Sequence, residues 1–122
     1  MNKAIESVAG DWNLTINEFA VAGIQNSTLW AHQWYVDTEE TIDEQLLSLK
    51  IDEKLKALND DYRVERGSAL TAVRAKALPN AIFYEWMKEH GKIGGQNKFP
   101  RVLKNEKLVN WEIFLKEMLL TS

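Results

Sequence analysis

The sequence predicts an α+β fold, in which helices pack on one face of a small, mostly antiparallel sheet of about three strands. In the N-terminal part, apolar residues alternate with polar ones, as in half-buried strands. Farther along, apolar residues recur at steps of three and four, as on one face of an amphipathic helix. In chain order these segments give α-β-β-α-β-α-α.

A short helix and a hairpin are predicted first. Residues 4–8 supply one or two helical turns, and Gly10 is a typical helix stop. Apolar residues alternate over 12–24, with a slip of phase at 17–18 that indicates a bulge or break. Residues 23–28 are rich in turn formers, so a second strand is expected to pair back on the first. That strand has Trp30, His32, Trp34 and Val36 on one face.

A long amphipathic helix and a third strand follow. Thr41 and Glu44 form a capping-box pattern, and Gly67 is expected to end the helix. Residues 69–77 predict a strand, because the segment is short, contains β-branched residues and lies between Gly67 and Pro79. The helix has apolar residues at Leu47, Ile51, Leu55, Leu58 and Tyr62.

Two helices flank an irregular segment at the C-terminal end. Pro79 and Asn80 open the first helix, Gly91 stops it, and residues 91–101 show no periodicity. Asn105 is expected to cap the final helix. The inner faces are Phe83, Trp86, Met87 and His90 in the first helix, and Leu108, Trp111, Leu115 and Met118 in the second.

Composition limits the class of protein. The 122 residues are 45% hydrophobic and 27% charged, which is typical of one globular domain. The absence of cysteine excludes disulfides, a thiolate nucleophile and a Cys-based zinc site. A net charge of -3 with interspersed signs argues against a nucleic-acid partner. No apolar run reaches the roughly 20 residues of a membrane span, and no signal-type segment is seen, so a cytoplasmic protein without membrane contacts is expected.

Most of the reactive residue types have an ordinary structural explanation. His32 is expected to be a half-buried, hydrogen-bonded strand residue and His90 a partner of a helix dipole, and no metal site is predicted. The five tryptophans are expected in the core, and no serine lies in a nucleophile-elbow pattern. A solvated acidic face is expected from Glu39, Glu40, Asp43, Glu44, Asp52 and Glu53.

Two arginines lie among acidic residues at the end of the long helix. Arg63 and Arg66 either contact an anion or neutralise nearby carbonyl and carboxylate groups. The spacing leaves both interpretations open and favours neutralisation.

The glycine-rich segment is the main candidate for function. It lacks a GxxxxGK[ST] pattern and does not follow a strand, so a phosphate loop of the nucleotide-hydrolase kind is excluded. Gly94 and Gly95 permit backbone conformations closed to other residues, and Pro100 restricts the exit. Lys98 is therefore expected on a loop with a defined path, from which it can reach a phosphate or carboxylate. An ordinary exposed lysine fits the spacing equally well.

Three motifs, in order, carry a resemblance to a known family. They are residues 59–66 (NDDYRVER), 83–87 (FYEWM) and 94–101 (GGQNKFPR), with weaker matches at 3–5 and 32–34. On these motifs the chain resembles the C-terminal domain of the acyl acid–amido synthetases of the auxin-responsive promoter (Gretchen Hagen) family, a branch of the adenylate-forming ligases. The last motif matches a Gln-x-Lys-x-Pro-Arg element.

Two departures from the plant members imply a bacterial relative, for which hormone substrates are not expected. The connection from helix to lysine is shorter, and Asn97 stands where plant members usually have an aromatic residue. The large N-terminal adenylation domain of the family has no counterpart here. Residues 1–122 are therefore expected to be a single C-terminal lid domain.

The resemblance implies a two-step ligation. A carboxylic acid attacks the α-phosphate of ATP to give acyl-AMP, and an amine or amino acid then displaces AMP. Lys98 matches the catalytic loop lysine, while the loop-shaping or phosphate-proximal residues would be Gly94, Gly95, Gln96, Pro100 and Arg101. ATP and Mg²⁺ would be bound mainly by the N-terminal domain, which is the expected partner, and no cofactor is expected on the isolated domain.

Two alternatives stay open. One is a free-standing, non-catalytic binding or regulatory module of the same fold, and the other is a small-ligand-binding α+β protein unrelated to ligases. Retention of Lys98 within the Gln-x-Lys-x-Pro-Arg element favours the ligase domain, because a docking module has no need of that lysine.

Overall fold

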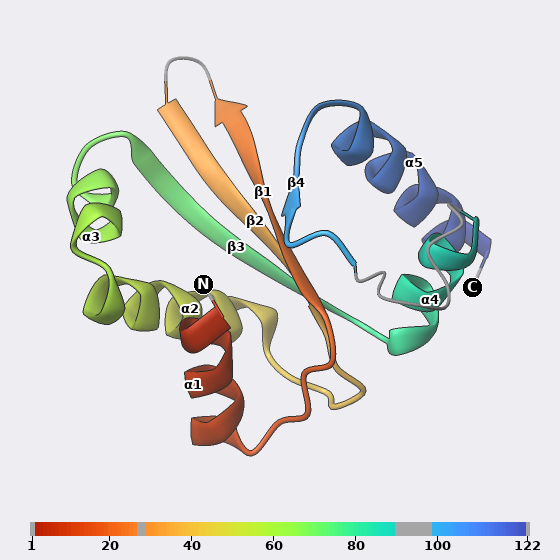
Figure 1. Ribbon diagram of the computed structural model, residues 1–122, viewed down its shortest axis with the longest axis horizontal. Helices are drawn as coiled ribbons and strands as arrows, with labels where there is room; N and C mark the ends of the chain where they lie inside the picture. The colour runs from red at the N-terminus through yellow and green to blue at the C-terminus, as the bar shows by residue number, and fades with distance from the viewer. Residues whose placement is uncertain (1, 27–28, 90–98, 122) are drawn as a thin grey trace.

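The computed structural model describes residues 2–26, 29–89 and 99–121, which form a four-stranded mixed sheet with helices on both faces (Figure 1). The predicted α+β class is confirmed. The elements are α1 (Asn2–Trp12), β1 (Phe19–Asn26), β2 (Leu29–Asp37), α2 (Glu44–Leu58), α3 (Asp60–Arg66), β3 (Leu70–Leu78), α4 (Asn80–Glu89), β4 (Val102–Leu103) and α5 (Asn105–Thr121).

The sheet has the strand order β3-β2-β1-β4. β1 and β2 form the predicted antiparallel hairpin, with Phe19 opposite Val36. β3 pairs parallel with β2, and β4 pairs parallel with β1, so the prediction of a mostly antiparallel sheet is wrong. The helical connection through α2 and α3 makes the parallel pairing possible, because parallel neighbours need a long crossover. β4 was missed because a strand of two residues shows no periodicity.

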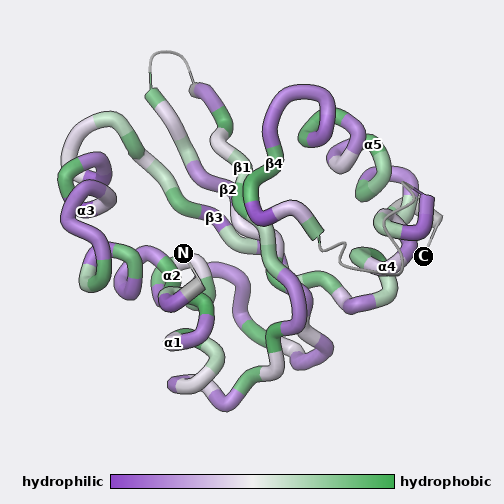
Figure 2. The backbone as a smooth tube through the Cα atoms, viewed as in Figure 1, coloured by the Kyte–Doolittle hydropathy of each residue, from purple (hydrophilic) through white to green (hydrophobic). Residues whose placement is uncertain are grey.

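Helices cover both faces of the sheet, where only one covered face was expected (Figure 1). Successive residues of a strand point to opposite faces, and both Trp34 and Tyr35 are buried. The core under α1, α2 and α3 contains Ala4, Ile5, Val8, Phe19, Val21, Trp34, Val36, Leu47, Ile51, Leu55, Tyr62 and Leu70. The core under α4 and α5 contains Ala20, Ala22, Tyr35, Leu78, Ile82, Phe83, Trp86, Phe99, Leu103, Trp111, Phe114 and Leu115. Figure 2 shows hydrophobic and hydrophilic residues interspersed along the helices, as expected of helices that cover a sheet.

The first helix is longer than predicted. α1 continues through Gly10 and ends at Trp12, and the next residue, Asn13, has a φ of 54°, in the left-handed region that asparagine tolerates. The Leu14 N–H donates to the Ala9 carbonyl at 2.9 Å, which is the bond of a Schellman-type helix end. The strand therefore begins at Phe19, so the phase slip marks its start and not a bulge within it. Most of the predicted turn belongs to β1, and residues 27–28 lie outside the described residues.

The long predicted helix is divided at Asn59, which has extended backbone angles. Its side chain accepts a hydrogen bond from the Tyr62 N–H at 3.0 Å and so caps α3. The expected capping box is also absent, because Asp43 caps α2 by accepting from the N–H groups of Gln45 and Leu46. α3 ends at Gly67 as predicted, and β3 is shifted by one residue from its predicted place.

The C-terminal helices form where the sequence predicts them, except that α5 begins at Asn105 itself, so the predicted cap lies one residue inside the helix. Phe83 and Trp86 of α4 and Trp111 of α5 are buried, whereas His90 and Gly91 lie outside the described residues. One tryptophan prediction is wrong, because Trp30 is 44% exposed. It lies near the tip of the β1–β2 hairpin, which extends beyond the helices (Figure 1).

Candidate functional site

The predicted catalytic segment is described only at its two ends. Gly94, Gly95, Gln96 and Lys98 lie outside the described residues, as do the other residues from 90 to 98. α4 leads into the segment and ends at Glu89. The described chain resumes at Phe99, the residue that follows Lys98.

Phe99 is anchored in the core under α4 and α5. Its side chain is 1% exposed, and its ring centroid lies 4.9 Å from those of Phe83 and Trp111. Both contacts are edge-on, the geometry that aromatic rings prefer. The backbone next to Lys98 is thus fixed to α4 and α5 by packing.

Arg101 fastens the same end of the segment to β1. Its guanidinium donates to Glu18 Oε2 at 2.6 Å and to the Phe19 carbonyl at 3.1 Å. The guanidinium carbon also lies 4.2 Å from the centroid of the Phe19 ring. In the backbone, the Val21 N–H donates to the Arg101 carbonyl at 2.9 Å. Half-buried Pro100 therefore lies between two anchored residues.

A buried carboxylate, which sequence analysis did not single out, lies where β2 ends and α4 begins. Asp37 is fully buried, and its Oδ2 accepts a hydrogen bond from Asn80 Nδ2 at 2.6 Å. Its backbone N–H donates to the Glu18 carbonyl at 2.8 Å. Burial raises the pKa of Asp37, and the bond from Asn80 opposes this effect. A single acidic residue after a strand carries no signal in the sequence that it will be buried.

The two arginines considered for anion contact are both paired with carboxylates. Arg66 Nε lies 2.9 Å from Asp52 Oδ1, and Arg66 Nη1 donates to the Leu70 carbonyl at 2.7 Å. Arg63 pairs with Asp60 on the surface of α3. These contacts support the neutralising interpretation.

Asp52 is buried, so the expectation that it belongs to a solvated face is wrong. The Tyr62 hydroxyl donates to Asp52 Oδ1 at 2.6 Å. Burial raises the pKa of Asp52, but the hydrogen bonds from Arg66 and Tyr62 outweigh it, and the net pKa is lowered. Burial, followed by the bond to Asp52, raises the pKa of Tyr62. This group of three, in which Asp52 and Tyr62 are buried and Arg66 is half-buried, ties α2, α3 and β3 together.

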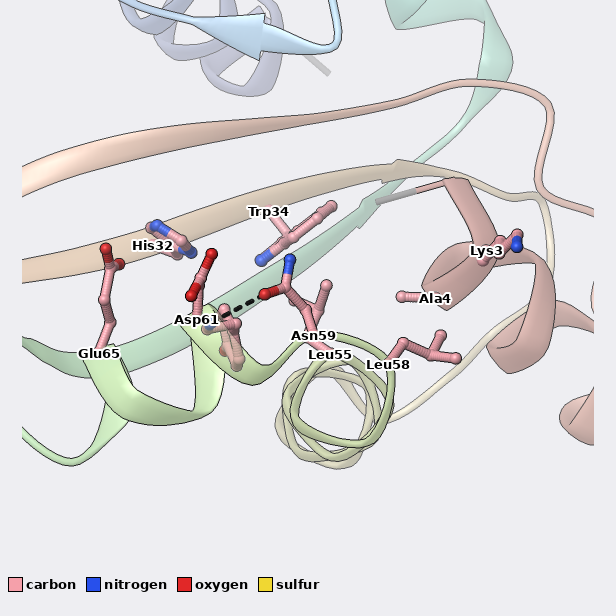
Figure 3. A pocket seen from close by; sticks show the side chains of 10 residues that line it. Lys3, Ala4, His32, Trp34, Leu55, Leu58, Asn59, Asp61 and Glu65 are labelled. Atoms are coloured by element: carbon pink, nitrogen blue, oxygen red, sulfur yellow. Dashed lines mark hydrogen bonds between the residues drawn. The ribbon is translucent and has the colours of Figure 1, made fainter.

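A cavity of about 340 Å³ lies against β2 (Figure 3). We call it the Trp34 pocket. It is lined by Lys3, Ala4, His32, Trp34, Leu55, Leu58, Asn59, Asp61, Tyr62 and Glu65. His32 is half-buried as predicted, but among the described residues its Nδ1 has no hydrogen-bond partner, contrary to expectation. Burial lowers the pKa of His32, which keeps the imidazole neutral at neutral pH.

Residues 2–26, 29–89 and 99–121 contain no group of three or more side chains that could hold a metal ion. Over the same ranges, no helix has the length and apolar character needed to cross a membrane.

Comparisons with known proteins give one matching family model and several solved structures of similar fold. The model of the "GH3 family C-terminal domain" matches residues 1–107. A solved structure of "GH3.15 acyl acid amido synthetase" is similar, with a TM-score of 0.67 and 18% identity over 89% of this chain. Another, "AtGH3.15 acyl acid amido synthetase in complex with 2,4-DB", has a TM-score of 0.69 and 17% identity over 94% of this chain. The chain spans 22% of the length of each. No curated protein matches in sequence.

Proposed function

The chain belongs to the GH3 family, as its C-terminal domain, and from this premise we propose that it is the mobile domain that delivers Lys98 to an ATP-dependent acyl acid–amido synthetase. This is the family that the motifs at 59–66, 83–87 and 94–101 resemble. The similar structures are named as acyl acid amido synthetases and are much longer than this chain. The proposed partner is therefore an N-terminal domain that binds the carboxylic acid and ATP.

The anchored exit of the 90–98 segment is the observation that carries this proposal. Phe99 is packed between Phe83 and Trp111, and Arg101 is bonded to Glu18 and Phe19. Lys98 directly precedes this anchor in the sequence. A rotation of the whole domain would therefore carry the backbone at Lys98 with it, as catalysis by a swinging domain requires.

In the first half-reaction, a carboxylate oxygen of the acid forms a bond to the α-phosphorus of ATP. The bond from that phosphorus to the bridging oxygen breaks, and pyrophosphate leaves with the electron pair. The Lys98 ammonium keeps its proton and interacts with the negative charge that is shared between the carboxylate and phosphate oxygens. A contact of this kind supplies about 3 to 4 kcal/mol of transition-state stabilisation.

In the second half-reaction, an amine or amino acid attacks the acyl carbon, loses a proton and releases AMP. The bond from that carbon to the phosphate oxygen breaks, and its electron pair leaves on AMP. No bond forms or breaks at phosphorus, which is where Lys98 acts in the first half-reaction. The proposed rotation would remove Lys98 at this stage and make room for the amine. Small carboxylic acids and amines are therefore the proposed substrate classes.

We assign ATP and Mg²⁺ to the N-terminal domain. Among the described residues, Arg63, Arg66 and Arg101 are all engaged by carboxylates of this chain. These three arginines therefore do not form a phosphate-binding site. The contribution of this domain is then the lysine and its placement, while Mg²⁺ would shield the ATP phosphates at ligands outside this chain.

Exchange of labelled pyrophosphate into ATP tests the proposed class of activity. The complete protein should catalyse exchange that depends on a carboxylic acid, and the 122-residue chain alone should catalyse none. Exchange by the isolated chain would contradict the division of roles. Failure of the folded complete protein with a broad panel of acids would favour the non-catalytic module.

A further inference from the structure

β3 forms one edge of the sheet and is paired with another strand, β2, on one side only (Figure 1). An edge strand leaves every second pair of N–H and C=O groups without a ladder partner, and a strand of another molecule can pair with such a row. β3 has nine residues, whereas β4, at the other edge, has two. β3 therefore presents a long edge at which a further strand could be added.

The hydrogen bonds at the end of β3 identify the backbone groups that point outward. The Leu78 carbonyl accepts at 3.0 Å from the N–H of the residue after β2, so Leu78 faces β2. The preceding N–H, that of Ala77, donates to Glu44 Oε2 at 2.7 Å and faces away from β2. Because this direction alternates along a paired strand, the N–H and C=O groups of Val73 and Ala75 also point outward. In the described part of the chain, no side chain caps these groups as Glu44 caps Ala77.

A groove lies beside these groups, between β3 and α2. It has a volume of about 430 Å³ and is lined by Glu44, Gln45, Ser48, Leu49, Ala72, Val73, Arg74 and Ala75. The α2 residues have the spacing of one flank of a helix, and Leu49, which is 58% exposed, gives this wall apolar surface. The space next to the outward backbone groups is therefore open, and it has a helix on one side. Strand addition uses such an edge, with main-chain hydrogen bonds for affinity and contacts of alternate side chains for specificity.

The face of β3 that points away from α2 carries two cations. Val73 and Ala75 pack against the core under α1, α2 and α3, so the alternate residues Arg74 and Lys76 lie on the other face. Arg74 is exposed and Lys76 is half-buried, and neither pairs with a carboxylate within residues 2–26, 29–89 and 99–121. Acidic side chains on an added strand would lie next to these two cations and pair with them.

The same cations disfavour a second copy of this chain as the added strand. Two β3 strands paired edge to edge would bring the cations of one copy next to those of the other, and like charges opposite each other in a sheet are destabilising. On the α2 side, Glu44 disfavours a further acid and Leu49 favours an apolar side chain. The two faces of the edge therefore select different residue types.

We propose that the β3 edge binds an extended segment of a partner protein in which acidic and apolar residues alternate. The backbone of this segment would pair with the N–H and C=O groups of Val73 and Ala75. Its acidic side chains would lie beside Arg74 and Lys76, and its apolar side chains would face α2 and contact Leu49. This surface shares no residue with the proposed Lys98 segment, so it goes beyond the proposed ligase function.

The probe is a blocked heptapeptide, Val-Glu-Val-Glu-Val-Glu-Val, and its matched control is Val-Lys-Val-Lys-Val-Lys-Val. Amide hydrogen exchange of the 122-residue chain, followed by NMR, reports the contact residue by residue. The glutamate peptide should slow exchange at Val73 and Ala75, which point outward, and change it little at Arg74 and Lys76, which are bonded to β2. The lysine peptide should bind about tenfold more weakly or worse, because two attractive contacts become repulsive.

Arg74→Glu combined with Lys76→Glu is the decisive variant. It should reverse the preference, so that the lysine peptide binds better than the glutamate peptide. Lys104→Glu combined with Lys107→Glu makes the same change in net charge at exposed positions far from β3 in the sequence and should leave the preference unchanged. Arg74→Gln is the milder variant if the double reversal unfolds the chain, and it should weaken binding of the glutamate peptide by about threefold.

Several results would overturn the proposal. Equal binding of the two peptides to the wild-type chain, or slowed exchange only at residues outside β3, would exclude an acid-selective strand addition. Protection of the Val73 and Ala75 amides that rises with protein concentration in the absence of peptide would identify a second copy as the occupant. Their protection in the complete protein without peptide would identify its own N-terminal domain as the occupant, in place of a separate partner.

Discussion

At the scale of single residues, the most consequential contacts are charged side chains that are partly withdrawn from water. Asp52 is held by Arg66 and Tyr62, and Glu18 is held by Arg101. An ionised group that is buried becomes costly when its partner is removed. Stability should therefore depend on these partners far more than on the exposed Arg63–Asp60 pair.

Replacement of Arg66 tests the group formed by Asp52, Tyr62 and Arg66. Arg66→Met should lower the free energy of unfolding by about 3 kcal/mol, because it leaves the Asp52 carboxylate poorly compensated. Tyr62→Phe, which removes one hydrogen bond, should cost about 1 kcal/mol. Urea unfolding measures both, with Arg63→Met as the control. If Arg66→Met and Arg63→Met have equal effects, Asp52 is solvated in solution.

The Arg66–Asp52 pair makes the stability of the folded chain depend on pH. The pKa of Asp52 is lowered in the folded state, so its contribution to stability is present above the ordinary value of 3.8 and is lost as the pH falls. The difference between wild type and Arg66→Met should therefore shrink in acid.

Replacement of Arg101 tests the anchor beside Lys98. Arg101→Met should lower the free energy of unfolding by about 1 to 2 kcal/mol, because it removes the bonds to Glu18 and Phe19 and the stacking on the Phe19 ring. Lys104→Met is the matched control, because Lys104 is exposed and directly follows β4 in the sequence. Urea midpoints that shift equally for the two variants would show that Arg101 does not fasten the segment.

At the scale of elements, sequence patterns predicted the helices and strands that depend on short-range interactions along the chain. The β1–β2 hairpin, β3, α4 and α5 follow from periodicity and from Gly and Pro punctuation. The division at Asn59 was missed because the apolar spacing continues across it from Leu55 to Tyr62. Trp12 fits the alternation of apolar residues that predicted the first strand, but it is the last residue of α1. Tertiary contacts decided both cases, and a single sequence does not display them.

The candidate site was also predictable only in part, where its residues are close together in the sequence. The anchor residues Phe99, Pro100 and Arg101 belong to the motif that sequence analysis singled out, whereas Glu18, the partner of Arg101, is distant in sequence. The Trp34 pocket draws on four elements, and no local signal predicts it. The roles of Gly94, Gly95, Gln96 and Lys98, and the bacterial origin, stay predictions.

Asp37 links two elements, and its pKa gives a second, opposite pH dependence. Because burial raises the pKa of Asp37 in the folded state, its favourable contribution is present below the ordinary value of 3.8 and is lost as the pH rises through the folded pKa. Asp37→Asn should therefore gain stability relative to wild type between about pH 4 and neutral pH. Glu106→Gln, at the exposed start of α5, is the control. Urea unfolding that gives a constant difference at all pH values would contradict the burial of Asp37.

At the scale of the whole molecule, two cores share one sheet. Trp34 lies in the core under α1, α2 and α3, and Trp111 lies in the core under α4 and α5. Phe19 of the first core and Ala20 of the second are consecutive in β1, so loss of either core exposes the sheet that supports the other.

This sharing predicts cooperative unfolding of the 122-residue chain as a monomer. Fluorine resonances of 5-fluorotryptophan at Trp34 and Trp111 should disappear at the same urea concentration as the far-UV circular dichroism signal. Separate midpoints for the two tryptophans would show that the cores are independent units.

In the proposed mechanism Lys98 serves adenylation and not amide formation, and a comparison of the two half-reactions in Lys98 variants tests this role. In the complete protein, Lys98→Ala should reduce acid-dependent pyrophosphate exchange by about two to three orders of magnitude. Amide formation from supplied acyl-AMP should change little, and Lys98→Arg should restore exchange only in part, because a planar guanidinium does not replace a compact ammonium. Lys92→Ala, in the same segment, should retain both activities. Equal losses in the two half-reactions, or full exchange by Lys98→Ala, would contradict the account.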